Sequence, residues 1–252
     1  MVDIGHTLLF IAVGAVIGAV GGVFGIGGAL ISIPLLSLGF GLDQQHAQGT
    51  SLVMGAPNCV IGMWRYAQHP AFDRRATIIM ALAALPLTYV GAYIAVHVAG
   101  HSLRPMFSAF IILLAVWSIV RAVRRGPFEP TPIARKPERI AVLGGVAGGL
   151  SGLFSSGGAA VAVPFLSLLF GYSQTTSQGM ALGLVTPGSI ISLVTYALAG
   201  AVDWQIGIPL AIGGTLFIKQ GVALAHRLPE CTLRLLFGGL LIVSALALFR
   251  TP

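Results

Sequence analysis

The chain has 252 residues and a formal net charge of +7, and 56% of its residues are hydrophobic while only 8% are charged. Soluble domains carry about 25% charged residues, so this composition excludes an ordinary soluble protein and indicates that lipid is the solvent. The basic residues lie between apolar segments and form no face with interleaved aromatic residues, which argues against a nucleic-acid partner.

Long apolar segments follow one another along the whole chain, and about 20 apolar residues suffice for a helix to span a bilayer. They cover about 7–40, 46–67, 76–98, 103–122, 140–171, 176–199, 205–224 and 231–250. The sequence therefore predicts an all-α polytopic membrane protein. Asp73 and Asp203 precede the third segment of each half, where a carboxylate caps a helix N-terminus.

The two halves of the chain carry related sequences at a constant spacing. Pro34 and Pro164 are 130 residues apart, and the same offset pairs glutamines, glycines and aromatic residues, among them Gln48 with Gln178 and Tyr66 with Tyr196. We expect a first repeat over 1–123, a basic, Pro-rich cytoplasmic linker over 124–139 and a second repeat over 140–252, together one membrane domain. Matched, Gly- and Pro-interrupted apolar segments indicate a transporter with its site between the halves.

The first segment of each repeat is too long for one crossing, since roughly 33 residues would make a helix of about 50 Å. Glycine-rich breaks stand at 25–28, which reads GIGG, and at 155–158, which reads SSGG. Two shapes fit, a long interrupted span or a re-entrant hairpin of two shorter helices.

The distribution of Lys and Arg favours the hairpin, because these residues accumulate in short cytoplasmic loops. With a hairpin and three crossing helices in each repeat, the repeats are inverted. About twelve Lys and Arg residues then lie on one side of the membrane and about two on the other. With a full crossing, the repeats are parallel and the ratio falls to about ten against four.

A broken helix inside a membrane marks a cavity, because its free backbone groups need partners. The half-helices that begin near Gly28 and Gly158 would point their positive ends into it, and such ends favour anions. Gln48 and Gln178 can donate amide hydrogens and the nearby hydroxyls can donate as well. The alternative is that the glycines only permit close packing and the polar side chains only satisfy neighbouring helices.

Lys219 is the only basic residue well inside a predicted span, where it either holds the charge of a substrate or snorkels to the interface. The candidate substrate-binding residues are Gly25, Gly27, Gly28, Gln48, Gly49, Thr50, Ser51, Asn58, Ser155, Ser156, Gly157, Gly158, Gln178, Gly179, Thr186 and Lys219. The sequence shows no metal-ligand spacing and no cofactor motif, so we expect no metal and no cofactor.

The duplicated Gly-rich break, followed by a Pro and a Gln-Gly-Thr-Ser stretch, resembles the TauE/SafE (DUF81) family of sulfite exporters. The resemblance implies a multi-pass transporter of the bacterial or archaeal inner membrane for sulfite, sulfoacetate or related organosulfonates. The residues of this chain that match the family's motif, and to which the resemblance assigns a part in the site, are Gly25, Gly27, Gly28, Gln48, Gly49, Thr50, Ser51, Gly157, Gly158, Gln178 and Gly179. The chain departs from the family pattern at Met180-Ala181 and at Lys219.

A secondary transporter of small sulfur-containing anions is therefore the leading hypothesis, with the lipid bilayer and a small anion as partners. The sequence leaves the coupling ion and homo-oligomerisation open. An anion channel and a membrane-embedded enzyme are the alternatives, but no nucleophile with a base is visible for an enzyme.

Overall fold

A computed structural model describes residues 4–98, 100–124, 136–155 and 157–249, and within them the regular structure is helical throughout. The helices are α1 (Ile4–Phe24), α2 (Ala29–Phe40), α3 (Gln44–Tyr66), α4 (Arg74–His97), α5 (Gly100–Arg124), α6 (Pro137–Leu153), α7 (Gly157–Leu169), α8 (Gln174–Leu198), α9 (Trp204–Ala225) and α10 (Glu230–Phe249). The predicted all-α class is confirmed. Most of the predicted linker, 125–135, lies outside the described residues, while 124 belongs to α5 and 137–139 belong to α6.

Side-chain caps fix where the helices begin. The Asp73 carboxylate accepts from the Ala76 N–H, and the Asp203 carboxylate accepts from the first N–H groups of α9, so both predicted caps are confirmed. Asp43 caps α3 and accepts from the backbone N–H of His46. Partial burial opposes ionisation of Asp43, but hydrogen bonds from His46 outweigh it and hold the pKa of this carboxyl below its ordinary value.

Both long first segments are interrupted, and each forms a hairpin. The rings of Phe10 and Phe40 lie 4.9 Å apart between centroids, so the end of α2 returns to the beginning of α1. In the second half, α6 runs alongside α4, and the Tyr172 hydroxyl just beyond α7 donates to Asp73 at the start of α4. The end of α7 therefore returns to the end of the molecule at which α6 begins.

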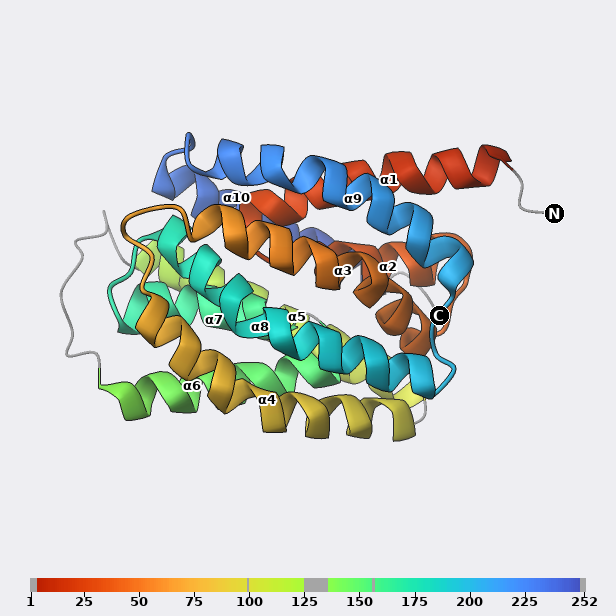
Figure 1. Ribbon diagram of the computed structural model, residues 1–252, viewed down its shortest axis with the longest axis horizontal. Helices are drawn as coiled ribbons and strands as arrows, with labels where there is room; N and C mark the ends of the chain where they lie inside the picture. Colours follow the sequence, from red (N-terminus) through yellow and green to blue (C-terminus); the bar gives the residue numbers. More distant parts are fainter. Residues whose placement is uncertain (1–3, 99, 125–135, 156, 250–252) are drawn as a thin grey trace.

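The two hairpins enter from opposite ends of the bundle (Figure 1). We call the left side of Figure 1, where α3 ends and α4 and α6 begin, the linker end, and the right side, where α1 begins and α8 and α10 end, the far end. The α1–α2 hairpin starts and finishes at the far end, and the α6–α7 hairpin starts and finishes at the linker end.

The tightest helix packing joins the hairpin of one repeat to a helix of the other. In α1, Gly18 lies against the Gly214 backbone of α9, and in α6, Gly148 lies against the Ala84 backbone of α4. Adding 130 to one partner and subtracting 130 from the other converts the first contact into the second, as a pseudo-twofold relation requires. Small residues at these positions let helix backbones approach closely in lipid.

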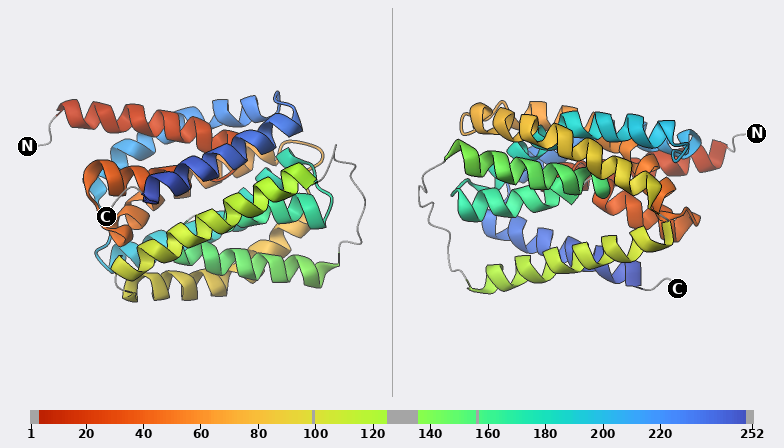
Figure 2. Two further views of the ribbon diagram at one scale, coloured as in Figure 1. Left: turned by 180° about the vertical axis from the view of Figure 1, so that it is seen from behind. Right: turned by 90° about the horizontal axis from the view of Figure 1, so that it is seen from below.

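This packing divides the molecule into two mixed bodies rather than into the two repeats. One body contains α1, α2, α3 and α9, and the other contains α4, α6, α7 and α8. The two bodies meet mainly where α3 packs against α8, while α5 and α10 pack mainly against each other and lie side by side in Figure 2. Helices α3 and α8 occupy matching positions in the sequence and run antiparallel (Figure 1).

The exterior of the bundle is apolar, as a lipid-facing surface is. Exposed side chains include Leu8, Val16, Leu82, Leu113 and Leu216. Within the described residues, Gly5–Phe24, Arg74–His97, Gln174–Leu198 and Trp204–Ala225 are long and apolar enough to span a membrane. The chain is thus a multi-pass membrane protein.

Replacement of Gly18 by Ala should destabilise the fold, because the new Cβ would lie 2.5 Å from Gly214 Cα. Overpacking of this kind costs about 2 kcal/mol, which corresponds to a melting temperature lower by roughly 4–8 °C. Gly39→Ala is the control, since no atom lies within 4 Å of a Cβ at that position. Thermal unfolding in detergent measures both variants, and an equal melting temperature for them would contradict the importance of the close approach.

Candidate functional site

The first hairpin turns at glycines with left-handed backbone angles. Gly25, Gly27 and Gly28 have φ values of 65°, 69° and 95°, which disfavour any residue with a side chain. The helix that follows, α2, has no side-chain cap at Gly28. The Asn58 amide donates to the Gly27 carbonyl at 3.2 Å, so a neighbouring helix satisfies part of the broken backbone.

The second hairpin turns in a similar way but with a serine. Ser155 has a φ of 60°, matching Gly25 130 residues earlier, and it is the only non-glycine residue with a positive φ in the part of the chain that the structure describes. Gly157 begins α7. Ser156 lies outside the described residues.

Gln178 lies at the first hairpin tip. The Tyr66 hydroxyl is 3.0 Å from Gln178 Oε1 and 2.9 Å from the Gly22 carbonyl oxygen, so it links the glutamine to α1. A Cβ at Gly25 would lie 2.5 Å from Gln178 Cβ, and a Cβ at Gly179 would lie 2.6 Å from Tyr66 Cβ. The Gln-Gly pair therefore supplies an amide and leaves room for the tyrosine of the other repeat.

Gln48 is arranged in the same way near the second tip. The Tyr196 hydroxyl donates to Gln48 Oε1 at 2.6 Å, and a Cβ at Gly49 would lie 3.1 Å from the Tyr196 ring. Ser155 lies near the Tyr196 hydroxyl without completing a hydrogen bond to it. We call these two groups the Gln178 cluster (Gln178, Tyr66, Gly25) and the Gln48 cluster (Gln48, Tyr196, Ser155).

Both glutamines keep an unused donor group in the protein interior. Each side chain is 0% exposed, and neither Nε2 has a hydrogen-bond partner. A buried amide without a partner costs about 1–3 kcal/mol, so such a group calls for a ligand or a bound water. None of the buried polar side chains among the described residues is charged, so the donors at these tips are neutral.

The structure does not bring the two glutamines together around one ligand. Tyr66, which contacts Gln178, is 18 residues from Gln48 along α3, or about 27 Å at 1.5 Å per residue. A single small anion therefore cannot contact both amides, and the expectation of one shared site needs correction. The hairpins reach past the middle of the bundle, so their tips lie in different halves of its length.

Other predicted residues are engaged elsewhere. Thr50 Oγ1 accepts from the Asp203 N–H at the start of α9, and the Ser51 hydroxyl donates to the Ala47 carbonyl. The Thr186 hydroxyl donates to the Leu182 carbonyl within α8. Asn58 lies close to the first tip, with Oδ1 unpartnered.

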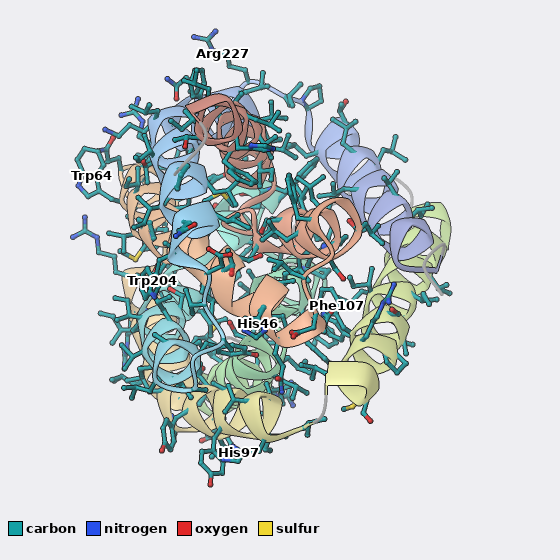
Figure 3. All side chains as sticks on the ribbon, turned by 90° about the vertical axis from the view of Figure 1, so that its right-hand side faces the viewer. His46, Trp64, His97, Phe107, Trp204 and Arg227 are labelled. Atoms are coloured by element: carbon teal, nitrogen blue, oxygen red, sulfur yellow. The ribbon has the colours of Figure 1, made fainter. Side chains whose placement is uncertain are left out.

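Lys219 lies on the outer surface, apart from both clusters. Its side chain is exposed, and its Nζ is 5.9 Å from the centre of the Trp64 ring. Figure 3, viewed from the far end, places Trp64 on the rim of the bundle. Lys219 is thus in the position expected for a snorkelling side chain.

The tyrosines that hold the glutamines were not among the predicted site residues. The 130-residue offset paired Tyr66 with Tyr196, and an aromatic residue with a hydroxyl at the end of an apolar segment was the available signal. Their partners are 112 and 148 residues away in the sequence, which spacing alone does not reveal.

Comparison with known proteins identifies the family. The family model described as "Sulfite exporter TauE/SafE" matches residues 10–248. The chain belongs to the TauE/SafE family. The glycine-rich breaks and the Gln-Gly pairs of this TauE/SafE protein all lie inside the matched range.

Relatives carry the name "probable membrane transporter protein". One from Methanocaldococcus jannaschii is 27% identical over 94% of this chain and 93% of its own length. One from Xylella fastidiosa is 29% identical over 96% and 94%, and YunE from Bacillus subtilis is 23% identical over 90% and 91%. These names support membrane transport, and none of them states a substrate.

Removal of the tyrosine hydroxyls should destabilise the TauE/SafE protein unequally. Tyr66→Phe leaves two buried acceptors without a donor, whereas Tyr196→Phe leaves one, the oxygen of Gln48. Hydrogen bonds between membrane helices contribute roughly 0.6–1.7 kcal/mol, so Tyr66→Phe should lower the melting temperature more. The exposed Tyr89→Phe is the control, and a larger effect of Tyr196→Phe would contradict the assignment.

Proposed function

We propose that the protein is a secondary transporter of small sulfur-containing anions such as sulfite, sulfoacetate or a related organosulfonate. The observation that carries this proposal is the pair of buried glutamine Nε2 groups that have no hydrogen-bond partner and lie beside broken helices. A family of sulfite exporters and relatives named as transporters support it.

The chemistry of the tips suits an anion. Amide and hydroxyl groups donate hydrogen bonds, and the first N–H groups of a half-helix add a positive potential. Neutral donors keep affinity modest, because no full charge opposes release of the anion. A carrier needs that balance, since it must discharge its substrate on the other side.

Alternating access is supported by two clusters at corresponding positions, which lie in different halves of the length of the bundle. In this proposal the sequence repeats are inverted in the membrane, and the two mixed bodies rock about the α3–α8 contact. Each cluster joins residues from both bodies, Tyr66 with Gln178 and Gln48 with Tyr196. Relative motion of the bodies would therefore change both clusters at once.

The two ends of the molecule differ in how the bodies meet. At the far end, the Gln45 amide of α3 donates to the Ala95, Val96 and Val98 carbonyls at the end of α4, which ties the bodies together. His46, beside this tie, lies near the middle of the far end in Figure 3. The residue that matches Gln45 is Thr175, whose shorter side chain lines a depression at the linker end.

That depression is shallow and is too narrow to enclose a water molecule. It is lined by Tyr66, His69, Phe72, Thr175, Thr176 and His226. Since Tyr66 contacts Gln178, the depression leads toward the Gln178 cluster. We infer a conformation that is closed by the Gln45 hydrogen bonds at the far end and by side-chain packing at the linker end.

Counterflow in proteoliposomes tests the function. Vesicles loaded with unlabelled sulfite should accumulate labelled sulfite transiently above its equilibrium level. A channel would show no such overshoot, and a protein that moves no sulfur anion would show no uptake at all. Either result would contradict the proposal.

Substitution of the glutamines tests the neutral donors. A hydrogen bond to a charged partner contributes about 1.5–3 kcal/mol, so Gln48→Ala or Gln178→Ala should weaken sulfite binding at its own cluster by roughly ten- to a hundredfold. Lys219→Met is the matched control and should change affinity by less than about threefold. Isothermal titration gives the values, and a greater loss at Lys219 would make the lysine the principal ligand.

A further inference from the structure

Among the described residues, the second hairpin tip carries two hydroxyls at positions where the first has glycine. Ser151 and Ser155 stand at the positions matched by Gly21 and Gly25. The two serines are 1% and 3% exposed, and neither hydroxyl has a hydrogen-bond partner. A buried hydroxyl without a hydrogen-bond partner is destabilising unless a ligand or a water molecule bonds to it. This tip can therefore donate hydrogen bonds to a ligand in addition to the one from Gln48.

These hydroxyls lie around the start of α7. A Cβ at Gly158 would lie 2.7 Å from Ser151 Cβ, so Ser151 packs against the first turn of this 13-residue helix. Ser155 lies near Tyr196, whose hydroxyl holds Gln48. Ser151 thus borders the positive end of α7, and Ser155 lies beside the tyrosine that holds Gln48.

The first tip offers less. Gly21 and Gly25 have no side-chain donors, and the stem of Gln178 fills the space beside Gly25, where a Cβ would lie 2.5 Å from Gln178 Cβ. A Cβ at Gly21 would lie 2.5 Å from the backbone nitrogen of Gly28. At the first tip, backbone atoms and the stem of Gln178 therefore occupy the space that the serine side chains fill at the second tip.

We propose that the second hairpin tip is the main anion-binding site and that Ser151, Ser155 and Gln48 select a head group with three oxygens. Each donor can serve one oxygen, as in sulfite or a sulfonate, whereas a carboxylate has only two oxygens to offer. The inference rests on the proposed transport of sulfur anions and adds to it the location and the selectivity of the site.

Two variants remove the hydroxyls with little other change. Ser155→Gly places glycine at a φ of 60°, where glycine is favoured, so the variant should fold at least as well as the parent. Ser151→Ala keeps the Cβ that packs against α7. Each should weaken sulfite binding by about tenfold or more in titration calorimetry.

Ser177→Ala is the matched control, because Ser177 is also buried with an unpartnered hydroxyl but lies next to Gln178. This variant loses a buried hydroxyl away from the second tip, so it should bind sulfite with an affinity within about twofold of the parent's. Selectivity is measured by competition with two monoanions of equal charge. Methanesulfonate should compete at least about tenfold better than acetate in the parent, and this preference should shrink in the Ser155→Gly and Ser151→Ala variants.

The outcomes separate the two proposals. If the parent binds none of these anions, the proposed function fails. If the parent binds sulfite and both serine variants bind it equally well, or if Ser177→Ala loses as much as they do, the function stands and the assignment of the site to the second tip is overturned.

Discussion

Close backbone contact between the hairpin of one repeat and a helix of the other is the interaction on which this structure depends. Gly14, Gly18 and Gly22 of α1 all pack against the backbone of α9, and their counterparts in α6 pack against α4. Lipid provides little hydrophobic drive between helices, so packing of this kind holds a membrane bundle together. It also embeds each hairpin in protein, which a broken helix at membrane depth requires.

The same contact explains why the structural bodies differ from the sequence repeats. Each hairpin packs against α9 or α4 of the other repeat, and α3 and α8 meet each other between these pairs. Their antiparallel crossing sets Gln48 beside Tyr196 and Gln178 beside Tyr66. The clusters are therefore a consequence of the exchanged packing.

Local features of the fold could be predicted from the sequence. The breaks at 25–28 and 155–158 follow from glycine and from the excess length of the segments, and the caps at Asp73 and Asp203 follow from a carboxylate before an apolar run. Long-range features could not be predicted, because the 130-residue offset shows which positions correspond but not which ones touch. Gln48 and Gln178 correspond, yet each contacts the tyrosine of the other repeat. Ser151 was missed because a lone serine in a glycine-rich helix resembles a packing residue.

Anomalous diffraction from crystals grown with selenite tests the central claim most directly, since selenite resembles sulfite and its selenium atom can be located without ambiguity. The account predicts a selenium peak at a hairpin tip within hydrogen-bonding reach of a glutamine Nε2, with the stronger peak beside Gln48 and the start of α7. A peak beside Lys219 or beside an exposed arginine such as Arg74 or Arg227, with none at either tip, would contradict an anion site built from neutral donors at broken helices.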